Sequence, residues 1–202
     1  VRALSDINMD ISAGEVHCLA GENGCGKSTL IKVISGAQKP TAGTVLVNAQ
    51  VEDNLTPQHA LSLGIDVIYQ DFSLLPNLSV AENIALPHFT TSKKRLATPR
   101  QARRFADEAI EKAAVALNPS ALVGDLTVAD RQLCAIVRAM AHKSTFLAMD
   151  EPTTALTWRE VDTLFAAVNN LRESGVAVAF ISHKLQEVFA IADRVSVMRN
   201  GE

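Results

Sequence analysis

The sequence has few of the residues that mark several protein classes. Its three cysteines, Cys18, Cys25 and Cys134, are odd in number and show no CxxC spacing. They predict neither a disulfide framework nor a zinc site, and they fit a reducing cytosol. Aromatic residues make up 4% of the chain, and the formal net charge is −3. Both features argue against a nucleic-acid partner, because such a partner needs stacking rings and a basic surface.

Long apolar runs and a leader segment are also missing. No run approaches the roughly 18 residues of a membrane-spanning helix, so we expect no such helix. No basic segment followed by an apolar core opens the chain, so we expect no signal peptide. The chain starts at Val1 without methionine and stops at Glu202, and we expect it to be a piece of a longer polypeptide. Its 202 residues, 48% of them apolar, suffice for one large domain or two small ones.

Short apolar segments that predict strands alternate with helical patterns near both ends of the chain. The alternation of Ile7, Met9 and Ile11 predicts a half-buried strand. Buried strands that alternate with helices are typical of an α/β fold, with a parallel sheet covered by helices on both faces. The other predicted strands are Val16–Ala20, Thr44–Asn48, Ile65–Tyr69, Thr145–Met149, Val176–Ile181 and Arg194–Met198.

The strand pattern disappears in the middle of the chain, where helices are predicted instead. Pro76 and Pro87 bracket one short helical stretch, and Thr98-Pro99 opens a long amphipathic helix. We interpret residues 72–143 as a helical subdomain inserted into a core formed by residues 1–71 and 144–202. The predicted helix N-caps are Thr56, Thr98, Thr127 and Thr157.

The stretch GENGCGKST, residues 21–29, matches the phosphate-loop pattern G-x-x-x-x-G-K-[ST] between a predicted strand and a predicted helix. Its glycines let backbone N–H groups close around phosphate oxygens. Lys27 would reach the β- and γ-phosphates of ATP, and the Ser28 hydroxyl would ligate Mg²⁺. The alternative, an ordinary glycine turn before a helix, requires neither residue. The predicted ATP contacts are Gly21, Glu22, Asn23, Gly24, Cys25, Gly26, Lys27, Ser28 and Thr29.

Polar side chains follow three of the predicted strands, at the carboxyl edge where an open parallel sheet binds ligands. Asp150 would hold Mg²⁺ through water, and Glu151 would take a proton from the attacking water. The alternative is an acidic pair that caps a helix. Gln70 and His183 are candidate sensors of the γ-phosphate, although spacing alone leaves open that each is an ordinary surface residue.

These motifs, with YQDFSLLPNLSVAENIAL, DEPTTAL and ISHKLQEVFAIADRVSVMRNGE, resemble the nucleotide-binding domain of ABC transporters along essentially the whole chain. More narrowly, the chain resembles the first domain of the sugar-import ATPases, which carry two such domains in tandem. The resemblance implies a P-loop NTPase fold, with a RecA-like parallel sheet and antiparallel edge strands. It also implies hydrolysis of ATP, with Mg²⁺ as cofactor, to drive import of a sugar or similar solute.

The resemblance assigns roles to single residues. Gln70 matches the glutamine that contacts Mg²⁺ and senses the γ-phosphate. Asp150 matches the Walker B aspartate and Glu151 the catalytic glutamate. Residues 154–157 match the D-loop, and His183 matches the switch histidine. Lys27, Glu151 and His183 are therefore the expected catalytic residues, and Ser28, Gln70 and Asp150 the expected metal ligands.

The resemblance also implies partners and a location. An integral-membrane permease would insert a coupling helix at residues 71–86. A second nucleotide-binding domain would come from the same longer chain or from a homodimer, and a periplasmic or extracellular solute-binding protein would act indirectly. The chain would then lie peripherally on the cytoplasmic face of the inner membrane. The aromatic residue on which the family stacks adenine would lie upstream of Val1.

Two other functions compete with solute import. A soluble ABC ATPase that acts on nucleic acid or ribosomes would be expected to carry basic arms or coiled-coil insertions, and the sequence has neither. A regulatory domain that binds nucleotide without hydrolysis does not need Lys27, Asp150, Glu151 and His183 together. A GTPase is disfavoured because no [NT]-K-x-D motif is present.

The segment Leu126–Asp130 departs from the family signature LSGGQ. Thr127 keeps a hydroxyl group, but Val128 and Ala129 place side chains where glycine backbone would meet phosphate. Asp130 brings a negative charge toward that phosphate. The segment is therefore either a weakened signature or simply a capped helix start, with Thr127 as N-cap. In the first case the two ATP sites of the assembled transporter would be unequal.

Overall fold

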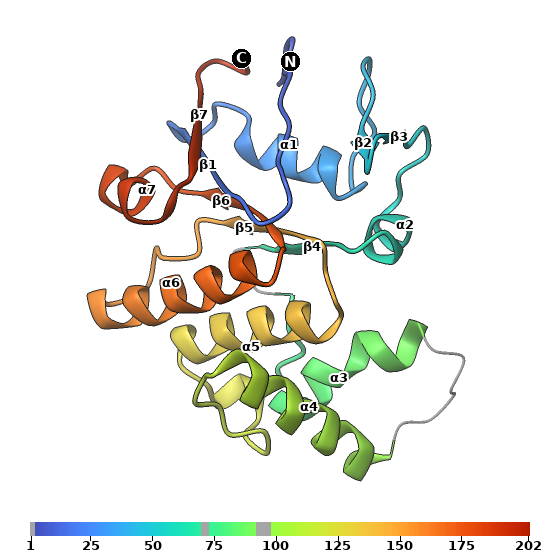
Figure 1. The fold of residues 1–202 in the computed structure, drawn as a ribbon, viewed down its shortest axis with the longest axis vertical. Helices are drawn as coiled ribbons and strands as arrows, with labels where there is room; N and C mark the ends of the chain where they lie inside the picture. The colour runs from blue at the N-terminus through green and yellow to red at the C-terminus, as the bar shows by residue number, and fades with distance from the viewer. Residues whose placement is uncertain (1–2, 70–72, 92–97) are drawn as a thin grey trace.

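The computed structural model of this chain describes residues 3–69, 73–91 and 98–202. Its centre is a parallel sheet of five strands in the order β4-β5-β6-β1-β7 (Figure 1). This sheet confirms the predicted α/β class. The strands are β1 (Val16–Gly21), β4 (Ile65–Ile68), β5 (Phe146–Asp150), β6 (Ala177–Ile181) and β7 (Arg194–Met198).

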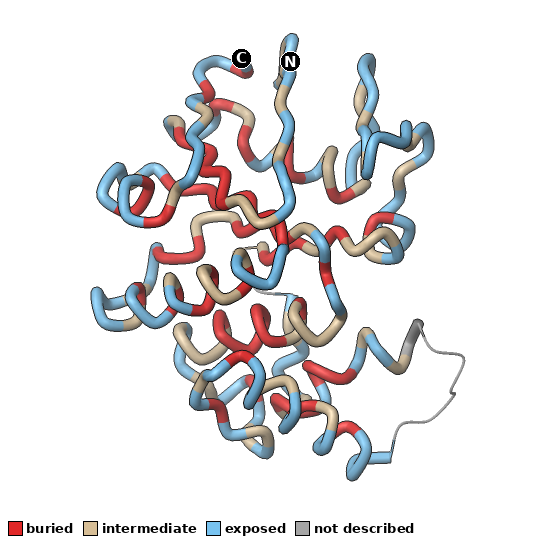
Figure 2. Tube along the Cα trace, viewed as in Figure 1, coloured by how far each residue is buried: buried red, intermediate tan, exposed pale blue. Residues whose placement is uncertain are grey.

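Strands β1, β4, β5 and β6 are largely buried on both faces, which is why they are mostly apolar, whereas Val195 and Val197 of the edge strand β7 are exposed. Along β6, Val178 and Phe180 belong to the core on one face, whereas Ala179 and Ile181 belong to the core on the other. Helix α1 (Lys27–Ile34) covers the second face, and α6 (Trp158–Glu173) and α7 (Leu185–Ile191) cover the first (Figure 1). Figure 2 shows the buried residues along the strands and on the sides of the helices that face them.

Three helices lie on the α6 side, farther from the sheet (Figure 1): α3 (Val80–Thr91), α4 (Pro99–Ala113) and α5 (Val128–Ala141). They pack against one another, and α5 also packs against α6. The predicted caps are confirmed. Thr98 and Thr127 accept hydrogen bonds from the backbone N–H three residues later, and Glu160 accepts from the backbone N–H of Thr157 at 2.7 Å.

The predicted stop at Pro87 is wrong, because α3 runs through it to Thr91. A proline inside a helix removes one hydrogen bond and strains the preceding turn. Beyond Pro87, however, the ring of His88 stacks on Phe105 of α4, with centroids 4.6 Å apart, and Phe89 lies near the same ring. These contacts stabilise a continuation that the local sequence disfavours.

The strand expected around Ile7, Met9 and Ile11 is also absent from the described residues. The three side chains are half-buried against the core on the α1 side. Their alternation therefore reflects an extended segment with one buried side, and, within the described residues, this segment is not paired with a strand of the sheet. The strand expected at residues 44–48 is shorter, since β2 (Leu46–Val47) pairs antiparallel with β3 (Gln50–Val51). The remaining elements are α2 (Pro57–Ser62), capped by Thr56, and a short 3₁₀ turn (Val123–Asp125).

Two absences expected from the sequence can be compared with the structure. Cys18, Cys25 and Cys134 are all buried, and none of them forms a disulfide. No helix within residues 3–69, 73–91 and 98–202 is long and apolar enough to cross a membrane.

A cluster of polar side chains surrounds the buried His17 near the amino end of β1. Its Nε2 lies 2.8 Å from Ser196 Oγ, and its Nδ1 accepts a hydrogen bond from Arg194 Nε at 3.2 Å. Arg194 Nε also lies 2.8 Å from Glu15 Oε1. Burial, and after it the positive charge of Arg194, lowers the pKa of His17 below its ordinary value. The folded protein therefore favours neutral His17.

We expect His17→Gln to make the free energy of unfolding depend less on pH below neutrality. In the unfolded chain His17 takes up a proton near pH 6.5, whereas the folded state resists that proton. Its contribution is therefore fully present above about pH 6.5 and is lost as the pH falls toward the lower folded pKa. Urea unfolding between pH 8 and pH 5 should show the free energies of wild type and variant converging. A constant difference would contradict the assignment.

Candidate active site

The predicted phosphate loop joins β1 to α1 at the carboxyl edge of the sheet. Gly24 and Gly26 adopt left-handed backbone angles, with φ of 82° and 110°. A side chain at Gly26 would also lie 2.8 Å from the carbonyl oxygen of Ala3 and from the Leu4 side chain. Glycine is therefore required at this position both for conformation and for space.

Lys27 is the charged residue at the centre of this loop. Its side chain is buried, with the residue 5% exposed, and Nζ donates to the carbonyl oxygens of Gly21 at 2.7 Å and Glu22 at 2.8 Å. Within the described part of the chain, no carboxylate forms an ion pair with it. A buried ammonium without a counter-ion favours binding of an anion, and the N-terminus of α1 adds positive potential.

Ser28 and Asp150 meet although they are 122 positions apart in the sequence. Ser28 Oγ donates to Asp150 Oδ2 at 3.0 Å. A hydroxyl oxygen beside a carboxylate at the start of a phosphate-binding helix is a donor set that fits Mg²⁺. Ser28 could ligate the ion directly and Asp150 through water.

Glu151 and His183 form a second pair beside the first. Glu151 Oε1 lies 3.0 Å from His183 Nδ1, and the two side chains are 22% and 43% exposed. Glu151 N–H donates to the carbonyl of Ile181, which is the last backbone bond between the ends of β5 and β6. Glu151 also has a φ of 49°, a left-handed angle that is uncommon for a residue with a side chain. Its carboxylate is accessible to water and could accept a proton from it.

The strand order explains why these residues meet. Strand β6 lies between β1 and β5, so the phosphate loop, the acidic pair and His183 follow three adjacent strands at one edge of the sheet.

The remaining residues of the phosphate loop differ in exposure. Glu22, Asn23 and Gly24 are exposed, whereas the Cys25 side chain is buried, with Sγ 3.7 Å from Lys27 Nζ. Any contact of Cys25 with a ligand would therefore come from its backbone. Gln70 lies outside the described residues.

The segment Leu126–Asp130 is the capped start of α5. Thr127 Oγ1 accepts from Asp130 N at 3.1 Å and donates to Asp130 Oδ2 at 3.0 Å. The predicted cap is thus confirmed, and the cap hydroxyl holds the Asp130 carboxylate. A role of this segment toward a second nucleotide stays a prediction.

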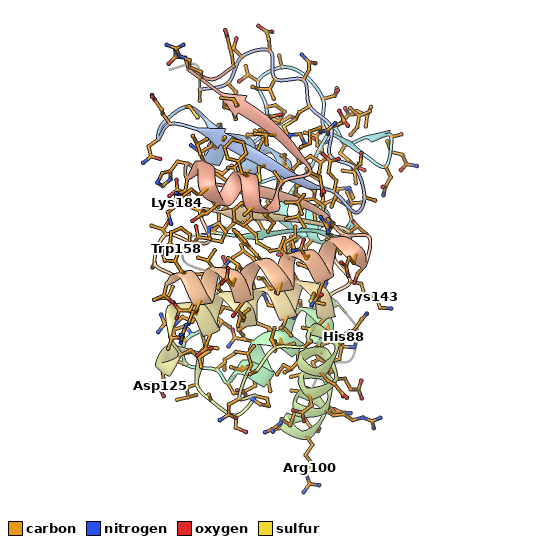
Figure 3. The ribbon with its side chains drawn as sticks, turned by 60° about the vertical axis from the view of Figure 1, so that its left-hand side comes forward. His88, Arg100, Asp125, Lys143, Trp158 and Lys184 are labelled. Atoms are coloured by element: carbon orange, nitrogen blue, oxygen red, sulfur yellow. The ribbon has the colours of Figure 1, made fainter. Side chains whose placement is uncertain are left out.

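Sequence reasoning missed Glu187 of α7. Its buried carboxylate lies close to Thr153, Ser182 and Lys184. Burial alone would raise the pKa of Glu187, but hydrogen bonds from these three residues outweigh burial and lower it. A signal was present in the sequence, because Glu187 shares the helix face of Val188 and Ile191, both of which are buried. Figure 3 shows Lys184 on the same side of the molecule as Trp158.

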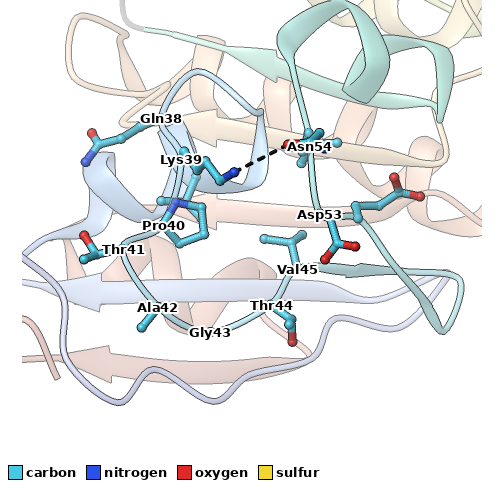
Figure 4. A pocket seen from close by; sticks show the side chains of 13 residues that line it. Gln38, Lys39, Pro40, Thr41, Ala42, Gly43, Thr44, Val45, Asp53 and Asn54 are labelled. Carbon is cyan, nitrogen blue, oxygen red and sulfur yellow. Dashed lines mark hydrogen bonds between the residues drawn. The ribbon is translucent and has the colours of Figure 1, made fainter.

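A cavity of about 370 Å³ lies away from these pairs, between residues 38–45 and residues 52–55 (Figure 4). Lys39 Nζ donates across it to Asn54 Oδ1 at 3.4 Å. The cavity lies beyond the C-terminal end of α1, whereas the phosphate loop precedes the N-terminal end. It contains none of the predicted site residues.

The chain is similar to known proteins over its whole length. The ribose import ATP-binding protein RbsA 1 of Rubrobacter xylanophilus is 44% identical over 203 residues, which cover 100% of this chain and 40% of the relative. A putative ribose/galactose/methyl galactoside import ATP-binding protein of Rhizobium meliloti is 40% identical, with 100% of this chain and 39% of the relative covered. The chain thus spans about two fifths of the length of these relatives.

Solved structures show the same architecture. The dimeric bacterial ABC transporter cassette MJ0796 superposes with a TM-score of 0.84 at 25% identity, covering 99% of this chain and 88% of that one. The ADP conformation of the ATP-binding cassette MJ1267 gives a TM-score of 0.84 at 27% identity, covering 98% and 82%. These likenesses confirm the predicted P-loop NTPase fold. A profile of the ABC transporter family matches residues 4–154. The chain therefore belongs to the ABC transporter family and has the fold of its ATP-binding cassettes.

Proposed function

We propose that this chain binds and hydrolyses ATP to energise import of a sugar or similar small solute through a membrane permease. One observation carries the proposal. The buried ammonium of Lys27 has no carboxylate partner among the described residues, and it stands at the edge that also holds the Ser28–Asp150 and Glu151–His183 pairs. The relatives named as ribose and galactose import ATP-binding proteins support the solute class.

The residues of the site divide the work of hydrolysis. Lys27 and the loop N–H groups bind the β- and γ-phosphates. Ser28 and Asp150 would hold Mg²⁺, with Gln70 as a further contact, and the bound ion would neutralise charge on the phosphate oxygens. Glu151 accepts a proton from the water whose oxygen attacks the γ-phosphorus, while the bond to the β–γ bridging oxygen breaks. The products are ADP and phosphate, and His183 orients the Glu151 carboxylate.

The proposed partners follow from the family. A second nucleotide-binding domain would complete the site, and Leu126–Asp130 would face the nucleotide of that partner. The permease would dock on residues 71–86, and in the described part of this stretch the side chains of Leu75 and Leu86 are exposed. Closure of the two domains would move the helices of residues 72–143 and with them the permease. The chain would lie peripherally on the cytoplasmic face of the membrane, and a solute-binding protein would deliver the sugar.

An assay of the full-length protein with its permease in proteoliposomes tests this proposal. We expect phosphate release that depends on Mg²⁺, falls to background after chelation with EDTA, and rises when the solute-binding protein and its sugar are added. Parallel assays with ribose, galactose and xylose identify the solute. ATP binding without hydrolysis would contradict the enzymatic part of the proposal. A rate of hydrolysis that does not change with the permease or with any of the sugars would contradict the transport part.

A further inference from the structure

Glu187 joins the two segments that carry Glu151 and His183. Its Oε2 accepts a hydrogen bond from Thr153 Oγ1 at 2.6 Å and another from Ser182 Oγ at 2.7 Å. Thr153 follows Glu151 closely, and Ser182 immediately precedes His183. All three linking residues are 1–2% exposed. One buried carboxylate oxygen thus holds both sides of the candidate site.

Lys184 completes this arrangement. Its Nζ lies 2.9 Å from Glu187 Oε1 and donates to the carbonyl oxygen of Thr153 at 3.2 Å, while its backbone N–H donates to Ser182 Oγ at 3.1 Å. An ionised carboxylate only accepts hydrogen bonds, so both hydroxyl groups must donate to it and their orientations are fixed. Charge-assisted bonds in a buried setting are also the stronger kind. We call Thr153, Ser182, Lys184 and Glu187 the Glu187 clamp.

The residues of the Glu187 clamp lie just beyond the carboxyl ends of β5 and β6. Strands β5 and β6 are paired up to Asp150 and Ile181, and the N–H of Glu151 makes the last backbone bond between them. Past that point Thr153 lies in a turn and Ser182 lies in the loop before α7. The sheet therefore fixes Asp150 directly, but the position of His183 relative to Glu151 depends on contacts beyond the strands.

We propose that Glu187 is a positioning residue, which acts through the clamp to keep the Glu151 carboxylate and the His183 ring at their 3.0 Å contact. This inference rests on the proposed function, because that pair would handle the attacking water. The hydrogen bonds and ion pair of the Glu187 carboxylate go to Thr153, Ser182 and Lys184, and, in the described part of the chain, none goes to residues 21–29, so its loss should impair the chemical step and spare ATP binding. Small displacements of a reacting group cost about tenfold to a hundredfold in rate.

The test is steady-state ATP hydrolysis by the full-length protein carrying Glu187→Gln. We expect kcat to fall about tenfold to a hundredfold while KM for ATP changes less than about twofold. Thr153→Val should lower kcat in the same way, and Thr153→Ser, which restores the hydroxyl, should recover turnover. The matched control is Glu15→Gln, because Glu15 also carries a largely buried paired carboxylate but lies at the amino end of β1.

Hydrogen exchange gives a readout that does not depend on activity. In Glu187→Gln, the amides of residues 151–156 and 182–188 should lose protection together, whereas those of the phosphate loop should not. Unchanged kcat, or exchange as slow as in wild type, would overturn the inference. If Glu187→Gln does not fold, the Thr153→Val and Thr153→Ser pair decides. A wild-type protein without turnover would contradict the proposed function. In that case, the comparison of hydrogen exchange between wild type and Glu187→Gln would still test the Glu187 clamp.

Discussion

Replacing Glu151 with glutamine is expected to lower ATP hydrolysis by the full-length protein about 10²- to 10⁴-fold and to leave ATP binding intact. Glutamine has the size of glutamate, so it keeps the space beside His183, but its amide cannot take a proton from water. The variant should therefore hold ATP without cleaving it. Because reopening of the paired domains would follow hydrolysis, solute import should stop as well.

Two measurements separate binding from chemistry in this variant. Titration with a fluorescent ATP analogue gives the Kd, and single-turnover phosphate release gives the rate of cleavage. Glu173→Gln is the control, because Glu173 is an exposed carboxylate at the end of α6. Turnover of Glu151→Gln at the wild-type rate would refute its role as the base.

Lys27→Ala has the second large expected effect, a loss of ATP affinity of about a hundredfold or more. A hydrogen bond to a charged group contributes about 1.5–3 kcal/mol, and Lys27 would contact two phosphates. The substitution also removes the donor that holds the carbonyl oxygens of Gly21 and Glu22. The loop itself should therefore become less ordered.

Fluorescent-ATP titration measures this loss, and thermal unfolding shows whether the variant is still folded. Lys32→Ala is a matched control, because Lys32 lies exposed on the same helix. Equal affinity in wild type and Lys27→Ala, with both proteins folded, would remove the main support for nucleotide binding at this loop.

The sheet and the phosphate loop could be predicted because their signals are local. Runs such as Val176–Ile181 must be buried on both faces, and Lys27 follows glycines whose backbone angles few other residues adopt. The meeting of Ser28 with Asp150 followed from one topological rule, that parallel strands present their carboxyl ends at one edge. The hydrogen bond from Ser28 Oγ to Asp150 Oδ2, at 3.0 Å, could not be predicted from the sequence pattern.

What could not be predicted depends on partners distant in the sequence. The helix continues through Pro87 because the ring of His88 stacks on Phe105 of α4. The low helix propensity of proline gives no indication of this distant contact. The helix face that Glu187 shares with Val188 and Ile191 indicates that it is buried, but its bond to Thr153, 34 positions away, is known only from the fold. The alternation of Ile7, Met9 and Ile11 could not distinguish a paired strand from an extended segment lying on a helix-covered face.

The left-handed backbone at Glu151 has a consequence for stability. For a residue with a side chain, this conformation costs about 1–2 kcal/mol, whereas glycine adopts it freely. Glycine at position 151 would relieve this strain, but it would also add conformational entropy to the unfolded chain and remove the contacts of the carboxylate with His183 and Thr154. The fold thus tolerates a strained backbone at the point where it presents the Glu151 carboxylate at the sheet edge.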